Sequence, residues 1–149
     1  MFKKQQKVMF QHCDPAGIVF YPRYFEMINA LVEDWFDEAL GYSFKHMHMD
    51  LGTGIPTVNT NVTFRNPSRL GDELTLILAV EKIGRSSVTC QVQALGEKPN
   101  SNTQSEIRFE GEVTLVYMDL NTGKSQSFPT ELKQSLGLYK TETIAVGDK

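Results

Sequence analysis

Apolar residues recur along this chain with two different spacings, one typical of a helix and one typical of strands. Between residues 22 and 40 they return every three or four positions, at Phe25, Ile28, Leu31, Val32, Trp35, Phe36 and Ala39. This spacing places them on one broad face, so it predicts an amphipathic helix packed against a sheet. Pro22 suits the first turn of such a helix, and Gly41 stands where a helix commonly ends.

Four later segments alternate in the way that is typical of strands with one buried face. The positions that share the inner face are Val58, Thr60, Val62 and Phe64; Leu74, Leu76, Leu78 and Val80; Val88, Cys90, Val92 and Ala94; and Ile107, Phe109, Val113, Leu115 and Tyr117. In the last segment the alternation places charged residues on the opposite, solvated face, namely Glu106, Arg108, Glu110 and Glu112.

The shorter predicted elements complete an α+β pattern. They are, in order, a strand at 4–13, a turn at 14–17, an irregular connection at 42–56, a turn at 121–123, a short strand at 124–128 and a short helix at 130–136. A strand, one long helix and then a run of antiparallel strands indicate a sheet that curls around the helix. We expect a single domain over residues 1–149, with an ordered core at about 4–138 and a loose polar tail from Lys140.

Composition narrows the classes of function. The chain of 149 residues has a formal net charge of −3, which gives no support to a nucleic-acid partner. The sequence contains no apolar run long enough to cross a membrane, so no membrane span is expected. Two cysteines, Cys13 and Cys90, do not make a disulfide framework and favour a reducing, cytoplasmic location.

The most specific chemistry lies just before the long helix. Asp14 opens a Pro-Ala-Gly turn, and an apolar stretch then leads to Pro22 at the predicted helix start. A carboxylate there faces unpaired backbone N–H groups and the positive end of the helix dipole. These are the minimum requirements for hydrolysing an activated ester. Taken alone, an aspartate before a proline is more often a turn former or a helix cap.

The sequence DPAGIVFYPRY at residues 14–24 closely resembles the signature of the 4-hydroxybenzoyl-CoA thioesterase family of hotdog-fold proteins. The resemblance covers most of the chain, up to about Pro129, and includes 22–40, 56–64, Gly71-Asp72 and Ser86-Ser87. It implies an antiparallel sheet of five strands, or slightly more, wrapped around the helix. It also implies a homodimer, often joined into a homotetramer, that hydrolyses acyl-CoA to a carboxylic acid and free CoA without a cofactor or metal.

The same resemblance implies roles for individual residues. Asp14 matches the catalytic carboxylate, as nucleophile or general base, and the backbone N–H of Tyr21 matches the group that polarises the thioester carbonyl. Gly17 and Ile18 are expected to line the substrate site, with Gly17 also serving the turn. Arg85 and Ser86 are expected to bind CoA phosphates, although a solvated loop arginine is an equally good interpretation of Arg85.

Several alternatives stay open at this point. His12 would share a face with Asp14 if the first strand continued, and a histidine beside a carboxylate is a candidate proton shuttle. His46 and His48 lack further ligands at useful spacing, so their segment is expected to line the acyl pocket and not to bind a metal. The rival functions are a hotdog acyl-CoA hydratase or dehydratase, and a non-catalytic acyl-CoA-binding or interaction module. The acyl group itself, and the choice between CoA and acyl carrier protein, do not follow from these residues.

Overall fold

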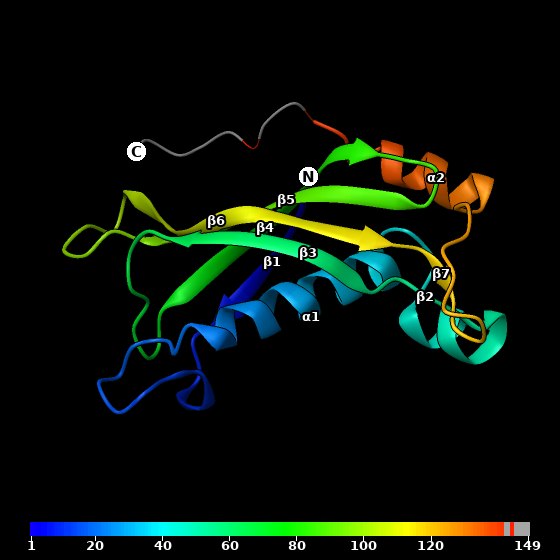
Figure 1. Ribbon diagram of the computed structural model, residues 1–149. Helices are drawn as coiled ribbons and strands as arrows, with labels where there is room; N and C mark the ends of the chain where they lie inside the picture. The colour runs from blue at the N-terminus through cyan, green and yellow to red at the C-terminus, as the bar shows by residue number, and fades with distance from the viewer. Residues whose placement is uncertain (142–143, 145–149) are drawn as a thin grey trace.

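A five-stranded antiparallel sheet curves over one long helix in the computed structural model, which describes residues 1–141 and 144 (Figure 1). The strands are β1 (Phe2–Lys7), β3 (Thr57–Phe64), β4 (Glu73–Ile83), β5 (Ser87–Glu97) and β6 (Ser105–Val116). Their order across the sheet is β1-β4-β5-β6-β3, and every neighbouring pair is antiparallel. The α+β architecture predicted from the sequence is therefore confirmed.

The shorter elements lie at the ends of this sheet (Figure 1). They are the 3-10 turn η1 (Phe10–His12), the π-helical turn η2 (His46–Leu51), the two-residue strands β2 (Thr53–Gly54) and β7 (Met118–Asp119), and the helix α2 (Thr130–Gly137). The strands β2 and β7 pair with each other outside the main sheet. The connection predicted as irregular at 42–56 thus contains η2, and the strand predicted at 124–128 is reduced to one bridge between Met118 and Ser125.

The predicted apolar stripe of α1 (Pro22–Glu38) forms the centre of the core. Its buried residues are Tyr24, Met27, Ile28, Leu31, Val32, Trp35 and Phe36. They pack with the inner faces of β4, β5 and β6 in one contiguous cluster. Full burial of each large apolar side chain contributes about 1.5–3 kcal/mol, so this cluster dominates the stability of the fold. Pro22 occupies the first helical turn as predicted, and Gly41 has φ +72° just after the helix.

The first strand is shorter than predicted, ending at Lys7 instead of at residue 13. The chain leaves the sheet at Val8, whose N–H donates to the carbonyl oxygen of Asp72 at 2.8 Å. The Val8 carbonyl in turn accepts the N–H of Gly71 at 2.9 Å. These bonds to the loop before β4 replace the next step of the strand ladder, which is why β1 stops there.

Strand β6 departs from the predicted alternation at one position. Ala94 of β5 pairs with Phe109, and Leu95 pairs with Ile107, so Arg108 is an extra residue in a β-bulge. The bulge re-aims this side chain, which is only 3% exposed. The prediction that Arg108 lies on a solvated face with Glu106 is therefore wrong.

Two further predictions meet the structure at the margins of the sheet. Strand β3 lies at one edge, and Val58, expected on the inner face, is 57% exposed beside a register shift between Thr57 and Asn59. The predicted loose tail begins at Lys140, which forms a bridge with Val80 of β4. The rest of the tail, apart from residues 141 and 144, lies outside the described residues.

Candidate active site

Residues 12–20 form a tight hairpin directly before α1. The N–H of Asp14 donates to the carbonyl oxygen of Ile18 at 2.9 Å, and the N–H of Gly17 donates to that of Asp14 at 2.9 Å. Gly17 has φ +77°, a left-handed conformation that glycine adopts without steric cost. The predicted turn at 14–17 is thus present, and it folds the segment back so that α1 begins close behind it.

The Asp14 carboxylate is fixed by the backbone of its own turn. Its Oδ1 accepts the N–H of Ala16 at 2.8 Å, and the side chain is partly buried. Among the described residues, Oδ2 has no hydrogen-bond or ion-pair partner. Asp14 forms the turn that the plainer interpretation expected, but it does not cap α1, which lacks a side-chain cap. One carboxylate oxygen therefore remains available to a substrate or a water molecule.

The start of α1 offers a donor close to this carboxylate in the chain. Tyr21 is the residue before the first helical position, with φ −52° and ψ −34°. Within residues 1–141 and 144 its N–H donates no hydrogen bond, and the following Pro22 has no N–H at all. The aligned peptide dipoles of this 17-residue helix add partial positive charge at the same end. The Tyr21 N–H is thus suited to bind an electronegative oxygen.

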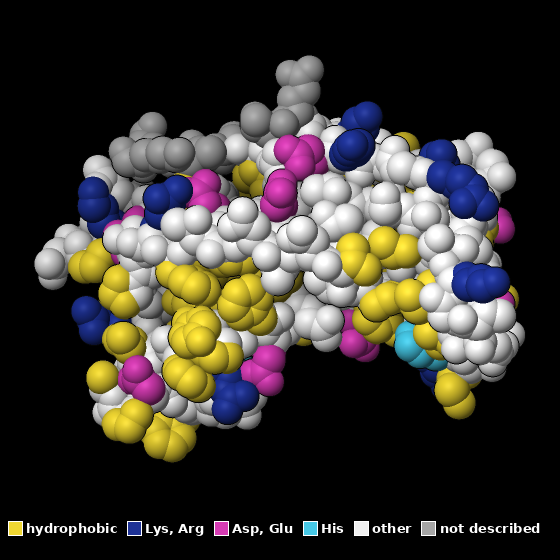
Figure 2. All heavy atoms as spheres, in the orientation of Figure 1, with side chains coloured by type: hydrophobic (Ala, Val, Ile, Leu, Met, Phe, Trp, Pro, Cys, Tyr) yellow, Lys and Arg dark blue, Asp and Glu magenta, His cyan; other side chains and the backbone are white. Residues whose placement is uncertain are grey.

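An exposed aromatic surface lies beside the helix start. The ring centroids of Tyr21 and Phe64 are 5.9 Å apart, those of Phe20 and Tyr21 are 5.6 Å apart, and those of Phe25 and Phe64 are 6.0 Å apart. Phe20, Tyr21 and Phe64 are 48%, 57% and 42% exposed. Figure 2 shows apolar side chains gathered below β3 on this face. We call these four residues the aromatic surface, and it is suited to contact an apolar group.

The segment at 66–72 holds the hairpin from behind. Ile18 forms a bridge with Arg69, and the carbonyl oxygen of Gly17 accepts the N–H of Leu70 at 3.0 Å. These contacts fix Gly17 and Ile18 within the same small structure as Asp14. Four of the six residues predicted for the site, Asp14, Gly17, Ile18 and Tyr21, are thus brought together.

The other two predicted site residues, Arg85 and Ser86, lie in the turn between β4 and β5. Strand β4 runs for 11 residues from the loop behind the hairpin to this turn, a distance of roughly 35 Å. Arg85 is exposed and lines a hollow that also contains Lys133 of α2. Within one chain, therefore, Arg85 and Ser86 do not approach Asp14.

His12 does not continue the first strand toward Asp14. It belongs to η1, and its Nδ1 accepts the N–H of Met9 at 2.8 Å. Burial lowers the pKa of His12 below its ordinary value of 6.5, which favours the neutral ring. The side chain lines a hollow formed with Gln6, Gln11, Arg23, Glu26, Met27 and Ala30. This geometry gives no support to a proton shuttle between His12 and Asp14.

The histidines near η2 are placed apart from these groups. His46 Nδ1 lies 2.9 Å from Asp50 Oδ2 on the same turn. Across the part of the chain that the structure describes, no three or more His, Cys, Asp or Glu side chains group together as metal ligands would. None of the described helices is both long enough and apolar enough to cross a bilayer.

Sequence reasoning missed the buried Arg108, because the alternating pattern assigned it to solvent. Two local signals accompany it in hindsight. Gly96 interrupts the apolar run of the neighbouring strand, and Asp72 directly precedes β4. A glycine inside a strand often marks a place where another group approaches closely.

Comparison with known proteins identifies the family. Residues 8–136 match the family model described as "Thioesterase-like superfamily". The chain is 27% identical over 107 residues to 4-hydroxybenzoyl-CoA thioesterase of Pseudomonas sp., covering 71% of this chain and 76% of that protein. It is 26% identical over 133 residues to long-chain acyl-CoA thioesterase FadM of Escherichia coli, covering 89% of this chain and 94% of that protein.

Solved structures share the fold. A hypothetical protein of Staphylococcus aureus in complex with CoA superposes with a TM-score of 0.85 at 17% identity, covering 99% of this chain and 89% of that one. The predicted hotdog fold is thereby confirmed, and the names of the relatives confirm the prediction of a thioester hydrolase. Because the family model spans most of its length, the chain belongs to the thioesterase-like superfamily.

Proposed function

We propose that this protein hydrolyses acyl-CoA thioesters to a carboxylic acid and free CoA, with Asp14 and the Tyr21 N–H as its catalytic groups. The observation that carries the proposal is one short segment holding a carboxylate oxygen without a partner and a backbone donor without an acceptor. The activities named for the relatives, on 4-hydroxybenzoyl-CoA and on long-chain acyl-CoA, support the substrate class. The reaction needs no cofactor.

The two groups divide the reaction between them. The Tyr21 N–H donates to the thioester oxygen and stabilises the negative charge that develops there as the carbonyl carbon becomes tetrahedral. Asp14 either attacks that carbon, giving a mixed anhydride that water then hydrolyses, or removes a proton from the attacking water. In both routes the carbon–sulfur bond breaks and the sulfur leaves as the CoA thiolate. Both also require Asp14 to be ionised, which the helix dipole favours.

The aromatic surface is the proposed contact for the acyl group. Its rings from Phe20, Tyr21, Phe25 and Phe64 adjoin the N–H that would bind the thioester oxygen. Aromatic and aliphatic acyl groups both gain from burial against such rings. The surface therefore favours an apolar acyl group over a charged one.

The site is completed, in this proposal, by a second copy of the chain. Strand β3 pairs only with β6 and leaves its other edge free, with Val58 and Phe64 exposed along it. Free edges and exposed apolar patches both favour association. Pairing of two β3 strands would extend the sheet, cover the aromatic surface and give a homodimer, the unit of the expected homotetramer. A second copy is also the way in which Arg85 could reach a site near Asp14.

Sedimentation equilibrium tests this assembly. We expect the wild-type protein to sediment as a dimer or tetramer, and Val58→Asp to shift it toward monomer because it places a charge on the pairing edge. A wild-type protein that remains monomeric at assay concentration would contradict the assembly. We place the reaction in the cytoplasm, which the two free thiols, Cys13 and Cys90, support.

Activity is tested with purified protein and a panel of aromatic, short-chain and long-chain acyl-CoA thioesters, using a thiol reagent to detect free CoA. Asp14→Asn should lower kcat by about 10²–10⁴-fold, because it removes the base or nucleophile while keeping the side-chain shape. Asp34→Asn, on α1 and away from the hairpin, is the matched control and should retain wild-type turnover.

Three outcomes would overturn the proposal. An Asp14→Asn variant with wild-type turnover removes the mechanism. Hydration of an enoyl-CoA without CoA release favours the hydratase. Binding of acyl-CoA without any hydrolysis favours a non-catalytic module.

A further inference from the structure

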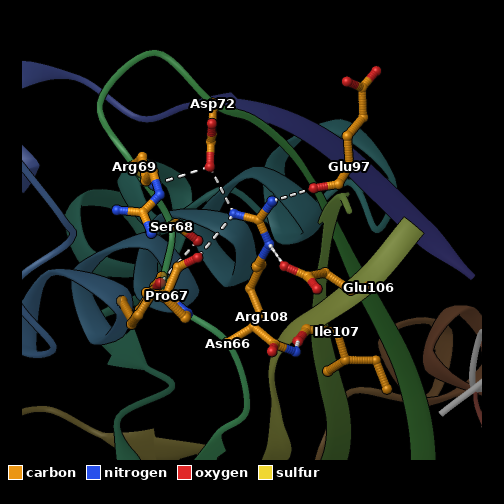
Figure 3. A network of polar contacts seen from close by, with 10 residues as sticks. Asn66, Pro67, Ser68, Arg69, Asp72, Glu97, Glu106, Ile107 and Arg108 are labelled. Carbon is orange, nitrogen blue, oxygen red and sulfur yellow. Dashed lines mark hydrogen bonds and ion pairs between the residues drawn. The ribbon is translucent and has the colours of Figure 1, made fainter. Parts of the chain in front are cut away.

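A buried arginine lies behind the hairpin, and the reaction proposed above gives it no role. The Arg108 side chain is 4% exposed. Its Nη1 donates to Asp72 Oδ2 at 2.7 Å and to the carbonyl oxygen of Pro67 at 3.3 Å (Figure 3). Its Nη2 donates to the carbonyl oxygen of Glu97 at 2.6 Å. Glu106 Oε1 lies 3.2 Å from Nε, within ion-pair distance but not aligned for a hydrogen bond.

The neighbouring strand is shaped to admit this guanidinium group. A Cβ atom added to Gly96 would lie 2.6 Å from both Cζ and Nη2 of Arg108. Only a residue without a side chain leaves the space that the planar group occupies. A lysine has a single ammonium group and could not reach the same three acceptors at once.

Arg108 and its strand fix the loop at residues 66–72 at several points. Asp72 Oδ2, which accepts from Arg108, also accepts the backbone N–H of Arg69 at 2.9 Å. At the other end of the loop, Asn66 Nδ2 donates to the carbonyl oxygen of Ile107 at 2.8 Å. Figure 3 shows these contacts converging on Arg108 from the loop and from both flanking strands. The loop is thus tied to β6 across its whole length.

The same loop holds the catalytic hairpin and the first turns of α1. Ser68 accepts the N–H of Val19 at its carbonyl oxygen at 2.9 Å, and the N–H of Leu70 donates to the carbonyl oxygen of Gly17 at 3.0 Å. From α1, the buried hydroxyl of Tyr24 donates to Ser68 Oγ at 2.9 Å. A continuous chain of contacts therefore joins Arg108 to the backbone that carries Asp14.

We propose that Arg108 is a positioning residue: by clamping the loop at 66–72 it fixes the hairpin and so holds Asp14 in register with the Tyr21 N–H. A buried ion pair adds little net stability over a well-packed apolar residue, so a role in selecting one loop geometry accounts better for its presence. Displacements of about 1 Å at reacting groups can cost roughly 10²-fold in rate. The catalytic part of this inference rests on the proposed function, whereas the clamp itself does not.

Kinetics of Arg108→Lys and Asp72→Asn test the catalytic part. Both variants should lower kcat about 10- to 100-fold and leave KM within about twofold, because the substrate-contacting groups are retained. The double variant should be no more than about threefold slower than the slower single variant, since the two residues act through one clamp. Glu110→Gln is the matched control: it breaks a 2.9 Å ion pair with Arg65 on the same strand and should stay within about twofold of wild type.

Amide hydrogen exchange tests the clamp without any activity measurement. The amides of Val19 and Leu70, which bond across the hairpin and the loop, should exchange at least tenfold faster in Arg108→Lys and as in wild type in Glu110→Gln. Asp72→Asn gives the same test if Arg108→Lys does not fold.

Two results overturn the inference: a folded Arg108→Lys or Asp72→Asn with wild-type kcat, or one with wild-type exchange at both amides. These differ from failure of the proposed function, in which the wild-type protein releases no CoA or Asp14→Asn stays fully active. In that case hydrogen exchange still decides whether the clamp exists.

Discussion

The two ends of the sheet hold their polar residues in different ways. At the hairpin end, Asp14 is fixed by its turn, the turn is bonded to the loop at 66–72, and the loop is bonded to the buried Arg108. At the α2 end, the exposed side chain of Arg85 forms no hydrogen bond or ion pair with any described residue. Fixed groups suit a transition state, whereas a mobile cation suits a flexible phosphate. The comparison therefore predicts that changes at the first end alter kcat and changes at the second alter KM.

The largest effect is expected from Tyr21→Pro. Tyr21 has φ −52°, which suits proline, and its N–H donates to no described group, so the substitution removes a catalytic donor and no internal hydrogen bond. Steady-state assays should show kcat lower by about 10²–10³-fold. Tyr21→Ala keeps the N–H and removes only the ring, so it should act mainly on KM. Equal kcat values for the two variants would show that this N–H does not bind the thioester oxygen.

A smaller effect, on stability, is expected from Gly96→Ala. The new Cβ would overlap the guanidinium group of Arg108, and such overpacking costs about 1–3 kcal/mol in the free energy of unfolding. Urea denaturation of the variant measures this loss. Gly137→Ala in α2 is the matched control, because its Cβ meets nothing within 4 Å and the change should stabilise by about 1 kcal/mol or less. If both variants unfold at the same urea concentration, Arg108 is not packed against Gly96.

The smallest effect is expected from Arg85→Gln at the other end of the sheet. Loss of one exposed cation that pairs with a phosphate should raise KM for acyl-CoA roughly three- to tenfold and leave kcat unchanged. The difference from wild type should shrink at high ionic strength, because salt screens exposed charges. A KM that equals the wild-type value at low salt would remove Arg85 from CoA binding, and a lower kcat would erase the distinction between the two ends.

The sequence predicted the elements whose signal is local. The helix expected at 22–40 is α1 (Pro22–Glu38), and the strands β4, β5 and β6 contain the segments where apolar residues alternate. Each of these elements buries one face against the others, so its own periodicity records the burial. Asp14, Gly17, Ile18 and Tyr21 lie together for a related reason, since they fall within one hairpin and the helix start that follows it.

What the sequence did not predict depends on contacts between distant segments. Strand β1 ends at Lys7 because the loop before β4 bonds to Val8, and Arg108 is buried because β6 contains one residue more than β5 at that point. Alternation cannot reveal an added residue. The role of Arg85 likewise depends on a second copy of the chain, so it stays a prediction.

The central claim, that Asp14 performs the chemistry and does not merely bind substrate, is tested most directly by single-turnover kinetics with enzyme in excess over acyl-CoA. The affinities of wild type and Asp14→Asn for the thioester are measured beside the rate of CoA release. We expect dissociation constants within about threefold and a release rate at least 10²-fold lower in Asp14→Asn. A variant that releases CoA at the wild-type rate, or whose whole defect is weaker binding, would contradict the account.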